Sequence, residues 1–222
     1  MKTKLYILLF AVLSLASCRQ AEKTVDTQLH TGDLIFVGIP YDYELTDSSS
    51  MDAAIVDATG DSLGVNYIHV AIVEVDGDSV WIIDATAKRG VDRYPIDTFC
   101  CDFRLKDGFY PQFDVMRLKG SPDCAGFVEK AKTFIGRKYD LAFLPDNEEQ
   151  YCSELVRNSF RNADGSYIFG EAPMNFKGPD GEFPPYWVQL FEWLGSPIPQ
   201  DKMGTNPNDM SKDTNLLYVT SF

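Results

Sequence analysis

Cys152 is the residue whose surroundings in the sequence most suggest chemistry. It lies in the stretch YCSELVRNSF, where apolar residues begin to recur at helical spacing, so we expect it at a helix N-terminus. Four roles compete for it: a buried apolar residue, half of a disulfide, a metal ligand or a nucleophile. Buried structural cysteines are common. At a helix N-terminus, however, the dipole and the free N–H groups stabilise a thiolate and can bind an oxyanion, which favours nucleophilic chemistry.

A cysteine nucleophile needs a base, and the chain has two histidines, His30 and His69. His30 lies in the polar stretch QLHTGD before a predicted strand. His69 begins the apolar stretch HVAIVEV, itself a predicted strand, and is the better candidate. A histidine at the start of a strand is also commonly structural. Residue types alone therefore leave open both Cys–His catalysis and a purely structural role.

The carboxylate predicted to orient His69 is Asp84. The strands NYIHVAIVEV and SVWIIDATA are joined by the hairpin sequence DGD. A type I′ turn centred on Asp76 and Gly77 sets the register of this hairpin. In that register His69 pairs directly with Asp84, and Glu74, the competing carboxylate, points to the other face. A register slip of one residue would reverse this assignment of faces. A three-residue loop would cause such a slip unless a bulge restored the register. The alternative role for Asp84 is a cap of the strand end.

The other cysteines are Cys18, Cys100, Cys101 and Cys124. Cys100 and Cys101 are adjacent, so a disulfide between them would be strained. A disulfide between Cys124 and either of them stays open. The sequence contains no CxxC pair and few histidines, so we expect no metal site and no cofactor.

The composition is that of a globular protein, with 222 residues, of which 45% are apolar and 13% aromatic. The net charge of −13 argues against nucleic acid as a partner, since phosphate contacts need a basic surface. With no repeat and no second core, we predict one α+β domain over residues 29–222. Strands are predicted at 31–40, 66–75, 79–87, 113–120 and 215–222, and a short strand followed by a turn at 90–100. Helices are predicted at 51–58, 122–136, 150–165 and 186–194. A further helix is predicted to start at Asn206 and Pro207.

The first twenty residues, MKTKLYILLFAVLSLASCRQ, have the features of an export signal. Two lysines precede an apolar stretch that is too short to cross a bilayer as a helix. The following LASC resembles the bacterial lipobox, in which the cysteine is lipidated and becomes the new N-terminus. The alternative is an ordinary secretory signal with a chance cysteine. We therefore expect a signal peptide at residues 1–17, a lipid on Cys18 and a polar tether at 18–28.

Four motifs in chain order, GDLIF, YIHVAIVE, GRKYDLAF and YCSELV, resemble the permuted papain-like amidases of the YiiX/YaeF type, within the NlpC superfamily of cysteine peptidases. In this branch the histidine precedes the cysteine, as it does here. The resemblance spans roughly residues 29–217 and includes the stretch GTNPNDMS. It implies a circularly permuted papain-like fold, with an antiparallel sheet packed on helices. It also implies that Cys152 is the nucleophile and His69 the general base and acid.

The resemblance implies roles for two further residues. Asp84 takes the position of the polar third member that orients the histidine, although the family usually has glutamate there. Tyr139, in GRKYD, matches a tyrosine that lines the pocket beside the cysteine, and its alternative role is a core aromatic.

The function implied by the resemblance is an amidase or peptidase of the bacterial envelope. Its substrate would be an amide in a peptide, such as a murein stem peptide. The enzyme would be held to the periplasmic or surface side of a membrane through Cys18. The alternatives are an acyl-transfer or lipid ester hydrolase with the same Cys–His pair, and a non-catalytic binding lipoprotein that keeps the fold.

Overall fold

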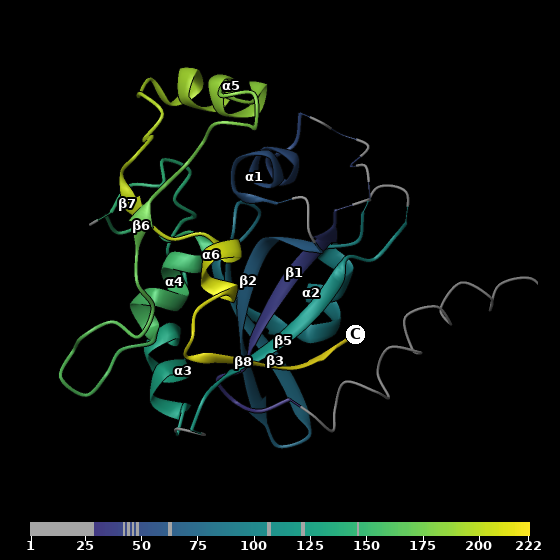
Figure 1. The fold of residues 1–222 in the computed structure, drawn as a ribbon. Coiled ribbons are helices and arrows are strands. Elements are labelled where there is room, and N and C mark those ends of the chain that lie inside the picture. Colours follow the sequence, from purple (N-terminus) through teal and green to yellow (C-terminus); the bar gives the residue numbers. More distant parts are fainter. Residues whose placement is uncertain are drawn as a thin grey trace, which may run out of the picture.

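The computed structural model describes residues 29–222 except positions 42, 44, 46, 48, 62, 63, 106, 107, 121, 122 and 146. The predicted signal peptide, the predicted lipidation site at Cys18 and the predicted tether therefore lie outside the described residues. A six-stranded antiparallel sheet of order β4-β3-β2-β1-β5-β8 forms the centre of the molecule (Figure 1). No helix in this part of the chain is long and apolar enough to cross a membrane. The predicted α+β class is confirmed.

Eight strands and six helices make up the described chain. The strands are β1 (Leu34–Pro40), β2 (Val65–Asp76), β3 (Ser79–Thr86), β4 (Gly90–Pro95), β5 (Gln112–Leu118) and β8 (Leu216–Ser221), with a separate short pair, β6 (Ala172–Pro173) and β7 (Met203–Gly204). The helices are α1 (Met51–Thr59), α2 (Ile96–Asp102), α3 (Ala125–Lys132), α4 (Cys152–Ser159), α5 (Pro185–Leu194) and α6 (Pro207–Ser211).

Two helices are shorter than their predicted stretches. After α3 the chain continues in tight turns, in which Thr133, Phe134 and Ile135 each bond to the carbonyl three residues earlier, as is common at helix ends. After α4 the chain turns at Phe160, which has extended backbone angles and a fully buried ring. Burial of that ring in the core outweighs continuation of the helical pattern.

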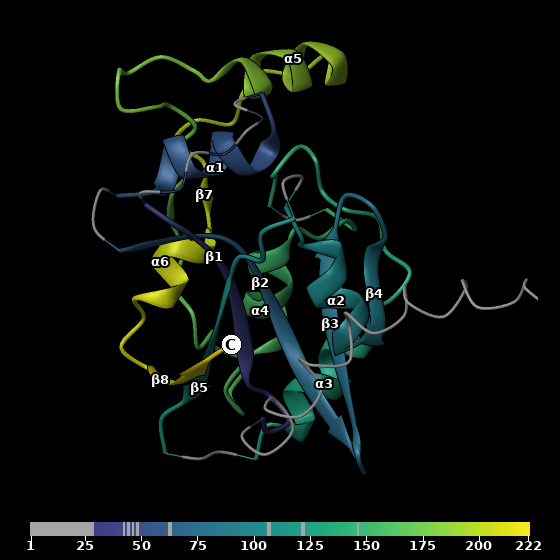
Figure 2. The same cartoon turned by 90° about the vertical axis from the view of Figure 1, so that its right-hand side faces the viewer.

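The sheet is covered on both faces. Leu34 and Phe36 of β1 pack with Leu155 of α4 on one face, whereas Ile35 packs with Phe99 of α2 on the other. Figures 1 and 2 show α3 and α4 on the first face and α2 on the second, with α1 and α5 at one end of the molecule. Burial of both faces explains why β1 and β2 read as nearly continuous apolar runs.

A bulge in β2 lies next to His69. Val37 of β1 pairs with His69 and the next residue of β1 pairs with Tyr67, so Ile68 is left between them. The Tyr67 N–H donates to the side chain of Asn208 in α6 at 2.7 Å, and Asn208 donates to Thr59 Oγ1 in α1 at 2.8 Å. Asn208 therefore ties the irregular part of β2 to α1 and α6.

The turn between β2 and β3 differs from the predicted one. Gly77 and Asp78 are its two central residues, because Asp76 pairs with Ser79. Gly77 has a φ of 59°, whereas Asp78 has a negative φ. This is the φ pattern of a type II′ turn, which takes glycine first because glycine has no Cβ to clash at positive φ.

The observed register is shifted by two residues from the predicted one, since Val75 pairs with Val80 and not with Asp78. The predicted direct pairing of His69 with Asp84 is therefore wrong. A shift of two residues keeps each side chain on its face, because side chains alternate with a period of two. His69 and Asp84 consequently share a face as diagonal neighbours, and diagonal pairs lie within reach of long or aromatic side chains.

Candidate active site

Cys152 is the first residue of α4. The preceding Tyr151 has extended backbone angles, and the first helical bond runs from the Leu155 N–H to the Tyr151 carbonyl at 2.9 Å. The N–H groups of Cys152 and Ser153 come before that bond and have no acceptor within the helix. The Tyr151 N–H donates to the Glu154 carboxylate at 3.4 Å, which closes the first turn. The thiol is thus at the positive end of the helix, as the sequence predicts.

A buried carboxylate fixes the orientation of the His69 ring. Its Nε2 lies 2.8 Å from Asp84 Oδ2, and Asp84 is fully buried. The Tyr94 hydroxyl donates to both Asp84 oxygens at 2.9 Å. The ring of Phe103 packs against the imidazole with centroids 4.7 Å apart. Since Nε2 faces Asp84, Nδ1 is the ring nitrogen left to interact with Cys152, which is among the causes of the raised pKa of His69.

The electrostatics of His69 follow from these two partners. Burial lowers its pKa, but the charge of Cys152 and the hydrogen bonds to Asp84 and Cys152 outweigh burial and raise the pKa to about 10. The imidazole is therefore a cation at neutral pH. A cationic imidazole beside a cysteine stabilises the thiolate, which is the reactive form.

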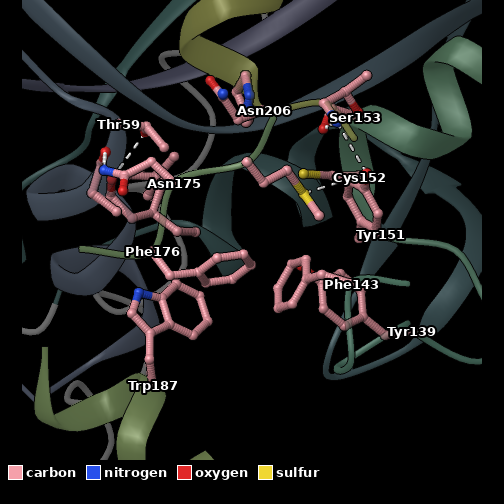
Figure 3. Close-up of a pocket in the computed structure, with 16 residues that line it drawn as sticks. Thr59, Tyr139, Phe143, Tyr151, Cys152, Ser153, Asn175, Phe176, Trp187 and Asn206 are labelled. Atoms are coloured by element: carbon pink, nitrogen blue, oxygen red, sulfur yellow. Dashed lines mark hydrogen bonds between the residues drawn. The ribbon is translucent and has the colours of Figure 1, made fainter. Parts of the chain in front are cut away.

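A cavity opens beside Cys152, and its empty space, counted together with the solvent at its mouth, is about 500 Å³. Residues of α1, β2, α4, α5 and α6 line it, together with the segments that precede α4, follow β6 and precede α6. The rings of Phe143, Phe176 and Trp187 form one side, with centroids 5.2 to 5.8 Å apart. Cys152 and Ser153 lie on the other side (Figure 3). Among the described residues that line the cavity none is charged. The nucleophile candidate thus faces an apolar wall.

Tyr139 also lines this cavity. Its hydroxyl lies 4.0 Å from Met51 Sδ, a weak acceptor, and its ring meets Phe143 edge-on at 6.2 Å. Burial, and next the charge of Cys152, raise the pKa of Tyr139 well above its usual range, so the phenol is neutral. Tyr139 is therefore located as the resemblance implies, and its role toward substrate stays a prediction.

The residues that competed for the site lie elsewhere. His30 is exposed and lies just before β1. In the same segment, the Gly32 N–H donates to the Val73 carbonyl, so this segment lies near the end of β2 that is farther from the bulge. Glu74 forms ion pairs with Arg93 and Lys132. Neither His30 nor Glu74 reaches Cys152.

The four described cysteines form no disulfide with one another. Cys100 packs with the cluster on the α2 face of the sheet, whereas Cys124 belongs to the cluster on the α4 face. The sheet therefore separates Cys124 from Cys100, and the disulfide that the sequence leaves open between Cys124 and the Cys100–Cys101 pair is not formed. Within the same described part of the chain, no three His, Cys, Asp or Glu side chains are grouped so that they could hold a metal ion.

Sequence reasoning missed two residues of the site. Tyr94 pairs across from Ile82 and so lies diagonally to Asp84. Pairing of the predicted strand in GVDRYP with the strand SVWIIDATA would have pointed to it. Asn208, in NPNDMS, links β2 to α1 through hydrogen bonds, and no local sequence pattern predicts such a link.

A cysteine at a helix N-terminus, a histidine on a neighbouring strand and a carboxylate behind that histidine, with the histidine first in the chain, define a papain-like cysteine hydrolase of permuted order. The chain belongs to the family of permuted papain-like amidases of the YaeF/YiiX type, family C92, whose model matches residues 28–220. It is therefore a member of a class of papain-like cysteine amidases and peptidases.

Two individual relatives agree with this family. The chain is similar to the uncharacterized protein YiiX of Escherichia coli K12, with 26% identity over 195 residues that make up 86% of each chain. Its fold is similar to a crystal structure of YiiX from Escherichia coli O157:H7, described there as a metalloprotein. The TM-score is 0.66 and the identity 23%, and the match covers 88% of this chain and 98% of the other. The predicted permuted papain-like fold is confirmed.

Proposed function

We propose that this protein is a lipid-anchored cysteine hydrolase of the bacterial envelope that cleaves an amide bond in cell-wall peptides. Cys152 is the nucleophile, His69 the general base and acid, and Asp84 the residue that orients His69. One observation carries the proposal: His69 has Asp84 Oδ2 at 2.8 Å from its Nε2 and interacts with Cys152, which raises the pKa of His69, and Cys152 itself lines the cavity. Nucleophile, base and orienting group within hydrogen-bond reach are the arrangement that covalent catalysis requires.

Acylation begins when the Cys152 sulfur attacks the carbonyl carbon of the substrate amide. The carbonyl oxygen takes the negative charge and accepts a hydrogen bond from the Cys152 N–H at the start of α4. His69 then gives its Nδ1 proton to the leaving nitrogen, and the C–N bond breaks. The products of this step are a free amine and a thioester on Cys152.

Deacylation uses the same groups in reverse. His69, now neutral, removes a proton from a water molecule as that water attacks the thioester carbonyl. The C–S bond breaks, the acyl group leaves as a carboxylic acid, and Cys152 and His69 return to the thiolate and the imidazolium. Asp84, 2.8 Å from Nε2, holds the ring in place in both half-reactions.

The apolar cavity favours a second candidate function, hydrolysis or transfer of an acyl ester by the same Cys–His pair. Phe143, Phe176 and Trp187 offer an apolar surface beside the nucleophile, and no charged residue is among the described lining residues. An aliphatic acyl chain suits such a wall, because its burial gains roughly 0.8 kcal/mol per methylene.

Incubation with two substrate sets separates the candidates. Purified murein stem peptides and p-nitrophenyl esters of two- to twelve-carbon acids should be compared at equal concentration, with products identified by mass spectrometry. Release of a new amine from the peptides supports the amidase. Turnover that rises with acyl length, without peptide cleavage, supports the second candidate. Ligand binding without turnover of either set would contradict both.

The raised pKa of His69 predicts the pH dependence of alkylation at Cys152. Because His69 stays protonated up to a pH of about 10, its positive charge favours the thiolate of Cys152 over the whole interval, so the rate with iodoacetamide should fall less between pH 8 and pH 6 in the wild type than in His69→Ala. In His69→Ala the rate should fall about a hundredfold over that interval, as for an unassisted thiol that titrates near pH 8.5. Peptide mapping distinguishes Cys152 from the exposed Cys101.

His30→Ala is the matched control for this experiment and should behave as the wild type. A wild-type rate at Cys152 that itself falls a hundredfold toward pH 6 would contradict the pairing with a cationic histidine.

The proposed anchor predicts a change in location when Cys18 is replaced. In the native host, Cys18→Ala should move the protein from the membrane fraction to the soluble fraction, because one residue carries the lipid. Fractionation followed by immunoblotting measures this. Cys101→Ala is the control and should stay with the membrane. Sedimentation of Cys18→Ala with membranes after a high-salt wash would rule out the lipid anchor.

A further inference from the structure

Asp52 is an ionisable group close to the site that the proposed mechanism does not use. It lies in the first turn of α1, and positions 52, 55 and 59 share one face of a helix. Ile55 and Thr59 line the cavity beside Cys152. Asp52 is therefore on the helix face that is turned toward the cavity.

The neighbours of Asp52 support this placement. Met51, the adjacent residue, contacts the hydroxyl of Tyr139. The charge of Asp52 acts on Tyr186 at the start of α5, and the cation on His69 acts on Asp52 in turn. Asp52 is therefore close enough to Tyr186 and His69 for its charge to interact with theirs.

Asp52 is partly buried and has no hydrogen-bond or ion-pair partner among the described residues. A carboxylate that is partly removed from water and has no partner in the fold loses part of its hydration. Asp84 and Asp33, which are more buried than Asp52, are paired with His69 and Arg117 respectively. An unpaired carboxylate beside a cavity without charged lining residues is suited to a ligand that brings a positive charge.

We propose that Asp52 selects substrates that carry a free ammonium group next to an uncharged, apolar portion. The apolar portion would lie against Phe143, Phe176 and Trp187, and the ammonium group would pair with Asp52. This inference deepens the proposed function and rests on it, because it names the substrate class of the same site. Acidic groups of a substrate would find no described basic side chain in the cavity lining.

Two structural roles for Asp52 make different predictions. A carboxylate in a first helical turn stabilises the helix dipole, and in that case its loss would change stability and leave ligand choice unaltered. A carboxylate that acted through His69 alone would change the pH profile of Cys152 alkylation. Neither role creates a preference for cationic ligands.

The test is calorimetric binding of three small ligands at pH 8 to the wild-type protein: hexylammonium, hexanol and hexanoate. We expect hexylammonium to bind at least tenfold more tightly than hexanol, and hexanoate to bind most weakly. In Asp52→Asn this preference for hexylammonium should disappear while hexanol binding stays unchanged. Asp57→Asn, an exposed position on the same helix, is the matched control and should keep the preference.

Equal binding of hexylammonium and hexanol to the wild type would overturn the proposal, even if Asp52→Asn failed to fold. A preference that survives in a folded Asp52→Asn variant would overturn it as well. None of the three ligands contains an amide or ester bond, so failure of this test is distinct from absence of hydrolytic activity, which would overturn the proposed function instead.

Discussion

Replacing Cys152 with serine should lower turnover by about 10⁴-fold or more, because the nucleophile, its base and the orienting carboxylate act as a unit. A serine hydroxyl in the same place is not ionised by a neighbouring imidazolium, so the attacking group is lost although the size of the side chain is nearly kept. The melting temperature should change by only a few degrees, which corresponds to about 1 kcal/mol in a chain of this length. Steady-state kinetics and thermal unfolding measure the two effects.

The matched controls are the other described cysteines. Cys100→Ser, Cys101→Ser and Cys124→Ala should keep turnover within about threefold of the wild type, since none of these thiols contacts His69 in the structure. Cys124 is buried, so its variant should lose some stability. Full activity in Cys152→Ala would overturn the covalent mechanism.

Replacing Asp84 with asparagine should lower turnover by about 10²- to 10⁴-fold. The Tyr94 hydroxyl would donate to the amide oxygen, which leaves the amide NH₂ group directed at Nε2 of His69. His69 would then carry its proton on Nδ1 as a neutral ring and could not accept one from Cys152. The loss should appear in kcat, together with an alkylation rate at Cys152 that falls steeply below pH 8.

Glu74→Gln is the matched control, because it makes the same carboxylate-to-amide change in the same hairpin. Glu74 pairs with Arg93 and Lys132 and not with His69, so this variant should lose stability and keep turnover within about threefold. A folded Asp84→Asn enzyme with wild-type kcat would contradict the orienting role.

Local patterns predicted the elements that carry the site. The strand that bears His69 and the helix that begins at Cys152 follow from short-range spacing, since periodicity records which side of an element is buried. Period-two alternation also placed His69 and Asp84 on one face, and it did so even though the turn was misplaced, because an error of two residues preserves the face.

Tertiary structure decided what short-range patterns do not encode. The turn position depends on which residue of DGD takes positive φ, and Gly77 does so at the first central position. The anchoring of Asp84 by Tyr94 depends on the pairing of β3 with β4, and the link from Asn208 to Tyr67 joins residues 141 positions apart.

The cavity is the clearest product of the tertiary fold. It forms where α1, α5, the start of α4 and the segments after β6 and before α6 converge, and the residues that line it are distant from one another in the chain. Sequence reasoning identified Cys152 and His69 because their residue types are distinctive. It left Trp187 between a core position and a wall of the cleft, and it could not assign Phe176 to a cavity wall or Asp52 to the edge of the cavity. An aromatic ring or a carboxylate has the same local pattern in a core, on a surface or beside a ligand, and only long-range packing distinguishes them.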